Sequence, residues 1–252
     1  LGLIKESARI LEAGFSSVPD FLKEGMKEVD LISRLEMVMR SMGHQGSLRF
    51  RRFNSIVPLG HVMSGPAAAC PSFLASPTGG KGTSLIFPQG AGYSRIKRNE
   101  PVFVDMVGIY NGYIADATRI FSLGRIEPEL EEAYQAACRI EEDLARQMSA
   151  GKTGRELYQL SEAAGADLGY QDYLGGPPGG KCGFVGHGVG LELDEYPVIG
   201  PLDHELQSNM TIAIEPKIIY PDKGVLGIED TFLTSSGAAE SLTHMPREIW
   251  QV

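Results

Sequence analysis

Apolar residues recur at spacings of three and four in two separate parts of the chain. The runs IKESARILEAGFSS (4–17) and LEEAYQAACRIEEDLARQ (130–147) show this spacing, which is typical of amphipathic helices. A second segment with the same period follows each run, at 21–45 and at 147–171. The pattern therefore predicts a pair of helices in each half of the chain.

The two second segments can be superimposed with an offset of 126 residues, half of the 252 in the chain. In the later copy Thr153 and Glu156 have the spacing of a capping box, and Asp30 takes the place of Glu156 in the earlier one. We therefore expect a single domain over 1–252, built from two related halves of about 126 residues each, 1–126 and 127–252. Four pairs of identical residues coincide, namely Gly25 with Gly151, Leu31 with Leu157, Gly43 with Gly169, and Gln45 with Gln171.

Strand patterns follow the helices in each half. Runs of β-branched and aromatic residues bounded by Gly, Pro and Asn predict strands within 53–63, 101–123, 183–199 and 210–234. Helical pairs that lead into strands predict an α+β fold with pseudo-twofold symmetry.

Composition and charge exclude several classes of function. The net charge is −9, and the one basic cluster, RFRRF with Arg49, Arg51 and Arg52, is too short to indicate nucleic-acid binding, so we expect a solvated or ion-paired face there. No stretch approaches the roughly 18 apolar residues of a membrane span, and the amino terminus lacks a signal-peptide pattern, so we expect a cytoplasmic protein without a membrane partner. The three cysteines are widely spaced and predict buried free thiols: Cys70, Cys138 and Cys182.

The segment DMVGIYNGYIAD (105–116) begins and ends with aspartate and has a turn signal at Asn111 and Gly112. A hairpin with residues 109–112 as its loop would pair Gly108 with Tyr113 and place Asp105 opposite Asp116. Two carboxylates that face each other in apolar surroundings are unfavourable unless something positive lies between them.

A second carboxylate hairpin is predicted in MTIAIEPKIIYPDKGVLGIEDTF (210–232). With residues 220–224 as the loop, Ile219 pairs with Val225, and Glu215 then faces Glu229. Two hairpins in different halves of the chain would therefore each present a pair of buried acids.

Between these hairpins lies GFVGHGVG (183–190), in which glycines surround His187 and let another part of the backbone come close. Oxygen ligands with one imidazole suit Mn²⁺ or Co²⁺, and also Fe²⁺ or Zn²⁺. Four carboxylates would balance two divalent ions, which is the usual composition of a two-metal hydrolytic site. The predicted ligands are Asp105, Asp116, His187, Glu215 and Glu229.

These motifs resemble those of the pita-bread metallopeptidases, which include methionine aminopeptidase, Xaa-Pro aminopeptidase and prolidase, with creatinase as a metal-free relative. The similar segments are DMVGIYNGYIADATRIF (105–121), GHGVGLELDEYP (186–197), IAIEP (212–216) and GIEDT (227–231). SGPAAACP (64–71) is closer to the Xaa-Pro and creatinase branch. The resemblance covers nearly the whole chain and implies two related α/β halves around a curved antiparallel sheet.

The resemblance also implies a role for each ligand. Asp116 and Glu229 would bridge the two metals, Asp105 would bind one of them through both oxygens, and His187 and Glu215 would complete the other. Xaa-Pro enzymes of the family carry an amino-terminal domain that caps the site and helps to form dimers. We expect this chain to lack that domain, and a homodimer is an expectation from the resemblance alone.

The chain departs from the family at three positions. Ser72 and Asp194 stand where family members have histidines near the scissile bond, and Gly227 stands where Xaa-Pro enzymes usually have arginine. Expelling an amine requires a proton donor within reach of the leaving group. We consider three candidates for this role, namely Asp194, Glu195 and His61.

Three functions remain open from the sequence. The first is a metal-dependent exopeptidase or dipeptidase acting on a peptide, with an Xaa-Pro bond as the expected target. The second is a hydrolase or lyase of a small molecule such as a small amide, with Asp194 as base. The third is a binding module without turnover, against which the intact ligand set argues because unpaired buried carboxylates are costly.

Overall fold

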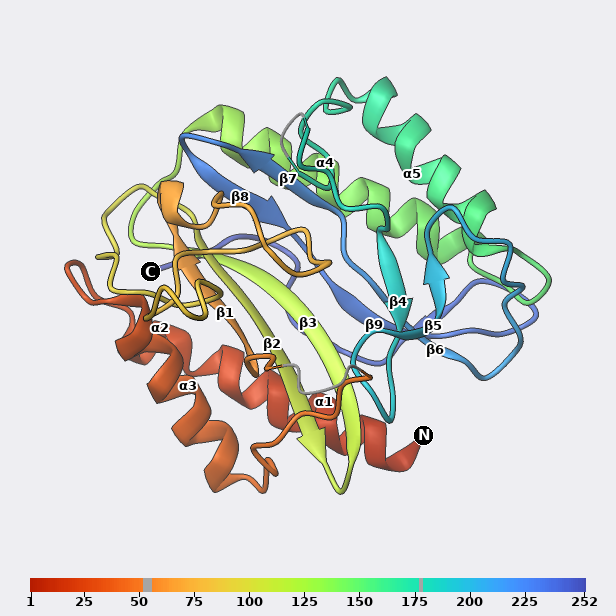
Figure 1. Cartoon of the computed structure of the whole chain (residues 1–252), viewed down its shortest axis with the longest axis horizontal. Helices are drawn as coiled ribbons and strands as arrows, with labels where there is room; N and C mark the ends of the chain where they lie inside the picture. The colour runs from red at the N-terminus through yellow and green to blue at the C-terminus, as the bar shows by residue number, and fades with distance from the viewer. Residues whose placement is uncertain (52–55, 177–178) are drawn as a thin grey trace.

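The computed structural model of the protein describes residues 1–51, 56–176 and 179–252. Arg52 and residues 53–55, part of a predicted strand region, lie outside the described residues. None of the helices in the described ranges is both long and apolar enough to cross a membrane. The helices are α1 (Gly2–Ser16), α2 (Val18–Phe21), α3 (Glu28–Ser41), α4 (Pro128–Gln147) and α5 (Gly154–Asp167), with a 3-10 turn η1 at Gly65–Ala67 (Figure 1).

Both ends of α3 and α5 are offset by the 126 residues that separate the two sequence copies. Left-handed glycines precede the helices, with φ of 79° at Gly25 and 91° at Gly151. Thr153 accepts a hydrogen bond from the Glu156 N–H, and the Glu156 carboxylate accepts one from the Thr153 N–H at 2.8 Å, which closes the predicted capping box.

Within the described ranges the strands form three sheets. A four-stranded sheet has the order β1-β2-β3-β11, a five-stranded sheet has the order β10-β9-β6-β4-β5, and β7 pairs with β8 alone. The bounds are β1 Gly60–Ser64, β2 Val102–Tyr110, β3 Tyr113–Ser122, β4 Gly186–Gly188, β5 Glu195–Ile199, β6 Thr211–Ile214, β7 Lys217–Tyr220, β8 Gly224–Gly227, β9 Asp230–Leu233, β10 Glu240–Ser241 and β11 Trp250–Gln251. An isolated bridge between Thr118 and Glu229 connects β3 to the segment between β8 and β9.

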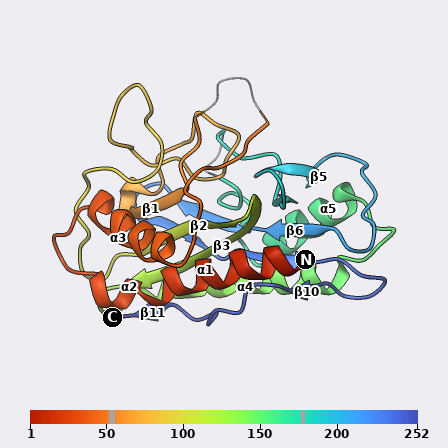
Figure 2. The same cartoon turned by 90° about the horizontal axis from the view of Figure 1, so that it is seen from below.

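The helices α1 and α4 lie on one side of the strands, and the irregular segments that follow β1 lie on the other (Figure 2). Ile10, Leu11 and Phe15 of α1 are fully buried against Val104 and Phe121 of the first hairpin. The second half has its own core cluster, in which α4 residues such as Tyr134 pack against β7 and β8. One face of the sheet is therefore closed by helices, and the other is left to loops.

The first hairpin has a tighter turn than the sequence predicted. Tyr110 pairs with Tyr113, so Asp105 lies opposite Thr118 and not opposite Asp116, which pairs with Val107. The prediction of a four-residue loop was wrong because Asn111, at φ 48°, and Gly112, at φ 84°, make a two-residue turn. A shift of two residues leaves every side chain on its original face, so the two aspartates remain diagonal neighbours.

The register of the second hairpin is confirmed. Ile219 pairs with Val225, and on the far side of the two glutamates Ile214 of β6 pairs with Asp230 of β9 in the same register. Glu215 and Glu229 therefore face each other where the strand pair passes from β7-β8 to β6-β9.

Candidate functional site

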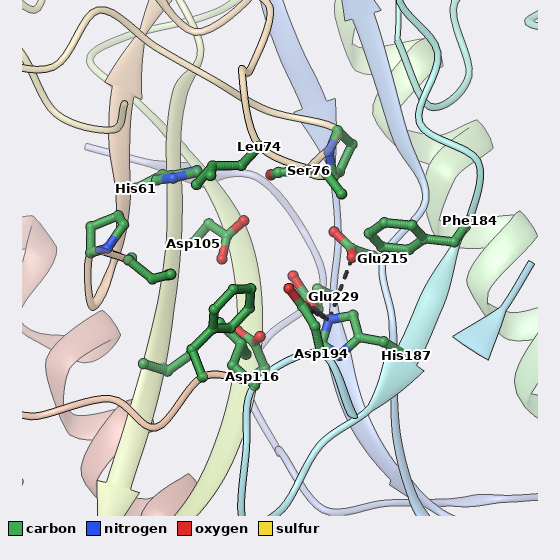
Figure 3. Close-up of a pocket in the computed structure, with 18 of the residues that line it drawn as sticks. His61, Leu74, Ser76, Asp105, Asp116, Phe184, His187, Asp194, Glu215 and Glu229 are labelled. Carbon is green, nitrogen blue, oxygen red and sulfur yellow. Dashed lines mark ion pairs between the residues drawn. The ribbon is translucent and has the colours of Figure 1, made fainter. Parts of the chain in front are cut away.

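A cavity of about 400 Å³ opens on the loop face of the sheets, between the two halves of the chain. Figure 3 shows the carboxylates and His187 turned toward a common space. All five predicted metal ligands line it: Asp105 on β2, Asp116 on β3, His187 on β4, Glu215 after β6 and Glu229 before β9.

His187 is positioned by glycines on both sides. A Cβ at Gly186 would lie 2.4 Å from the carbonyl oxygen of Ala213, and one at Gly188 would lie 2.6 Å from that of Tyr196, so both neighbouring strands require glycine here. The His187 Nδ1 lies 3.1 Å from the carbonyl oxygen of Gly188, which leaves Nε2 facing the cavity.

Around Nε2 of His187, carboxylate oxygens of Asp194, Glu215 and Glu229 lie at 3.3, 3.5 and 3.9 Å. Burial would lower the pKa of His187, but these three acids raise it above its ordinary value. The imidazole is thus the point where the acids of the second half converge.

Asp116, His187 and Glu229 each offer one ligand atom within 4.8 Å of the others, and all three are buried. The Oδ1 of Asp116 has no hydrogen-bond partner among the described residues. Burial, followed by the charge of Glu229, raises the pKa of Asp116 well above its ordinary value. Buried acids beside an imidazole, with one oxygen unpaired, fit a single divalent cation.

Lys217, which the sequence analysis missed, lies among the remaining acids. Its Nζ is 2.5 Å from Oε2 of Glu215, 2.8 Å from Oε2 of Glu229 and 3.1 Å from Oδ2 of Asp105. The side chain is 1% exposed. Burial would lower the pKa of Lys217, but the charges of Asp105 and the two glutamates raise it well above its ordinary value.

The described residues therefore do not fit two divalent ions as they stand. The ammonium of Lys217 binds Asp105 and Glu215, which were expected to hold different metals. A period of two along a strand places Lys217 on the same face as Glu215, and this signal in IEPKII could have revealed it from the sequence.

The two oxygens of the Glu229 carboxylate face different groups, Lys217 on one side and His187 on the other. Its Oε2 accepts hydrogen bonds from Lys217 and, at 2.8 Å, from the Thr118 hydroxyl. Burial raises its pKa to about 8, together with the charges of Glu215 and Asp105 and against the lowering effect of Lys217. Oε1 remains directed toward His187.

His61, on β1, pairs with Asp105 of β2 and lines the cavity, but both of its ring nitrogens lie within hydrogen-bond distance of other side chains. The Gln89 amide nitrogen lies 3.0 Å from the Thr78 carbonyl oxygen and 3.1 Å from Nε2 of His61, so it donates to both. Nε2 is then an acceptor, and Nδ1 donates to the Thr78 hydroxyl at 3.0 Å. Burial lowers the pKa of His61, consistent with this neutral tautomer.

The other two candidates for proton transfer differ in position. Asp194 lines the cavity with its side chain 35% exposed, and its φ of 57° is a left-handed conformation uncommon outside glycine. Glu195 is not among the described residues that line the cavity, and its carboxylate accepts a hydrogen bond from the Glu192 N–H at 2.9 Å. Of the two acids, the geometry supports Asp194.

Three smaller predictions can be compared with the structure. Arg49 and Arg51 both pair with Glu192, at 3.4 and 2.5 Å, as expected of an ion-paired face. Ser72 donates to Oε1 of Gln89 at 2.9 Å and so belongs to the network around His61. The three cysteines are free thiols, as predicted, but the prediction that all are buried holds for Cys138 and is wrong for Cys70 and Cys182, which are partly exposed.

A model of the metallopeptidase family M24 matches residues 2–236. The chain belongs to metallopeptidase family M24. This M24 chain is 27% identical over 248 residues to the Xaa-Pro dipeptidase of Pyrococcus furiosus, with 98% of the chain and 62% of that relative covered. The family predicted from the sequence motifs is confirmed.

Solved structures of M24 relatives confirm the pita-bread α+β fold. The X-Pro aminopeptidase from Thermotoga maritima superimposes with a TM-score of 0.83 at 26% identity, and the Xaa-Pro dipeptidase from Bacillus anthracis with 0.82 at 28%. Each alignment covers 100% of this chain and 62% of the relative. The chain thus spans less than two thirds of the length of the relatives it matches.

Proposed function

We propose that this M24 chain hydrolyses an amide bond in a short peptide or small amide, with Xaa-Pro dipeptides as its first expected substrates. The observation that carries the proposal is the buried triad of Asp116, His187 and Glu229 at the base of a cavity, in a chain of metallopeptidase family M24. The sequence predicted two ions, Mn²⁺ or Co²⁺, whereas the triad would hold one such ion.

A divalent ion on the triad would make a water molecule nucleophilic and polarise the substrate carbonyl. The chain's own residues would orient that chemistry. Thr118 and Lys217 hold Oε2 of Glu229, so Oε1 is left for the ion. The Nδ1 contact with Gly188 O keeps Nε2 of His187 turned toward the same point.

Asp194 would handle the proton. Its Oδ1 lies 3.3 Å from Nε2 of His187, at the edge where solvent and substrate enter. A carboxylic acid there can protonate a leaving amine, or its carboxylate can bind a cationic substrate group such as an α-amine. Both roles place Asp194 in contact with the substrate.

A second candidate function is favoured by the state of His61. Because Thr78 and Gln89 occupy both its nitrogens, His187 is the only imidazole among the described residues with a nitrogen directed into the cavity. Asp194 would then act as base on a non-peptide substrate, as a small-molecule hydrolase or lyase requires.

The test is mass spectrometry of a mixed peptide pool incubated with Mn²⁺-loaded protein, beside an EDTA-treated control. Metal-dependent loss of a residue that precedes proline supports the Xaa-Pro proposal. An untouched pool contradicts it and moves the search to small amides and lyase substrates.

The matched variants are Asp194→Asn and Glu195→Gln, which neutralise neighbouring acids inside and outside the cavity. We expect a rate loss of roughly 100-fold or more for Asp194→Asn only, in line with general acid–base catalysis. Equal losses in both variants would argue against a proton-transfer role for Asp194.

Self-association and cytoplasmic location, both expected from the sequence, would be tested by light scattering and by fractionation of cells.

A further inference from the structure

Lys217 lies in a site built to hold its side chain. It is the first residue of β7 and pairs with Gly227 of β8. A Cβ at Gly227 would lie 2.6 Å from Cγ of Lys217, so the glycine leaves room for the lysine stem. Farther along, Nζ lies 5.6 Å from the centre of the Phe103 ring, a cation–π distance.

The contacts of Nζ are those of a bound cation. An ammonium has three N–H donors, and three carboxylates surround Nζ: Glu215, Glu229 and Asp105, at 2.5, 2.8 and 3.1 Å. Two of them come from the second hairpin and one from the first. A divalent ion would require the same oxygens at roughly 2.0–2.2 Å and could not share this point with Nζ.

We propose that the Lys217 ammonium replaces one of the two divalent ions, so that the site takes no more than one ion, held by Asp116, His187 and Glu229. This inference rests on the proposed function in one respect, the placement of the remaining ion on the triad. It does not depend on which substrate the protein hydrolyses. The four acids then meet three positive charges, one from Lys217 and two from the metal.

The alternative is that a metal displaces the lysine. A cavity of about 240 Å³ lies beside Lys217 and Glu215, lined also by Glu162 and Cys182, and it could receive the displaced side chain. Movement into it would separate Nζ from Asp105, Glu215 and Glu229, and a second metal would then have to balance these acids. The number of bound metals therefore distinguishes the two arrangements.

The experiment counts ions without using activity. Wild-type protein, Lys217→Ala and Lys223→Ala are dialysed against Mn²⁺, and metal per chain is measured by mass spectrometry of the elements. Lys223 is the matched control because it is a lysine in the turn of the same hairpin, paired with Glu127 and Glu129 at the surface. Melting temperatures with Mn²⁺ and with EDTA are recorded in parallel.

We expect one equivalent in wild-type protein and in Lys223→Ala, and one further equivalent in Lys217→Ala. The Lys217→Ala variant should also show the largest rise in melting temperature on addition of Mn²⁺, because its three acids lack a counter-charge until the metal binds. Two equivalents in wild-type protein, or no further equivalent in Lys217→Ala, would overturn the proposal.

No ion in wild-type protein and one in Lys217→Ala would keep the role of Lys217 and remove the metal from the proposed function. If Lys217→Ala does not fold, the wild-type count decides the question. A crystal of wild-type protein soaked in Mn²⁺ adds a direct view, since an anomalous peak between Asp105 and Glu215 contradicts the proposal and a peak at the triad alone supports it.

Discussion

Arg119 and Asp230 form a buried ion pair directly behind the candidate metal site. Nη2 of Arg119 lies 2.8 and 3.0 Å from the two carboxylate oxygens of Asp230, and Nη1 donates to the main-chain oxygen of Glu229 at 2.9 Å. Arg119 is fully buried, and the carboxylate of Asp230 balances its charge. The pair therefore fixes the segment between β8 and β9, which carries Glu229, relative to β3, which carries Asp116.

Replacement of Arg119 by Met should strongly destabilise the fold. Removing one partner of a buried ion pair costs about 3–5 kcal/mol, and here Asp230 would keep as counter-charge Arg247, which lies 3.2 Å away and is shared with Glu141. Urea unfolding would measure the loss. The double variant Arg119→Met, Asp230→Asn should recover part of it, and equal stabilities of the single and double variants would contradict the explanation.

The control for this prediction is Arg155→Met. Arg155 pairs with Asp203 at 2.6 Å on the surface, where water screens the charges. Its unfolding midpoint should remain close to that of wild-type protein, so a large change there would show that any lost arginine is harmful.

The sequence predicted on which face of the sheet each ligand side chain lies better than it predicted which residue pairs with it on the neighbouring strand. Alternation along a strand keeps Asp105 and Asp116 on one face whether the turn has two or four residues, so both line the cavity in spite of the wrong register. The location of His187 was also available, because glycines around it indicated close strands. The two-residue turn depends on left-handed φ angles at Asn111 and Gly112. The Asn-Gly dipeptide indicated such a turn, but the predicted loop of residues 109–112 was two residues too long.

Side-chain partners were much harder to predict. The spacing of two residues could have placed Lys217 on the face of Glu215, but not beside Asp105, which is more than a hundred residues away in the chain. The network of His61, Thr78 and Gln89 depends on a loop whose path no periodic pattern specifies. Local patterns therefore predict elements and faces, while contacts between distant loops require the structure.

Removal of the His61 imidazole should affect stability more than chemistry. His61→Leu leaves the buried Thr78 hydroxyl without its partner and removes one acceptor from the Gln89 amide, at a cost of about 1–3 kcal/mol. Gln89→Leu should have a similar effect because it breaks the same network without removing the imidazole.

The pH profile of turnover distinguishes this role from proton transfer. If His61 donated a proton, His61→Leu would lose roughly 100- to 10,000-fold in kcat and one limb of the profile. We expect the two variants to keep the wild-type profile, measured on whichever substrate the peptide pool yields. A limb missing from His61→Leu alone would restore His61 as a catalytic residue.

Glu141 should make the stability depend on pH. Its carboxylate is fully buried, and burial together with Asp230 raises its pKa to about 8, against the lowering effects of Arg247 and Arg119. The folded state then holds a proton that the unfolded state, with its ordinary pKa of 4.5, releases. The contribution of Glu141 to the free energy of unfolding is fully present below about pH 4.5 and is lost as pH rises toward about 8.

Glu141→Gln removes that proton exchange, so its free energy of unfolding should fall less between about pH 5 and about pH 8 than that of wild-type protein. Glu142→Gln is the control, because Glu142 is the adjacent glutamate with a side chain about half exposed, 52%. Urea unfolding at several pH values measures both slopes. Identical slopes in wild-type protein and Glu141→Gln would mean that Glu141 ionises normally in the fold.

Asp116→Asn should abolish metal binding while leaving the metal-free protein stable. Asp116 is one of the three triad residues, and its Oδ1 has no other partner among the described residues. Its raised pKa shows that the charged form is costly without a cation, so a neutral amide should not destabilise the protein in EDTA. In Mn²⁺ at 100 times the dissociation constant, wild-type protein should gain about 2.7 kcal/mol that the variant does not. Asp222→Asn, in the exposed turn of the second hairpin, should behave as wild-type protein. An unchanged metal content in Asp116→Asn would remove Asp116 from the ligand set and, with it, the triad on which the proposed function depends.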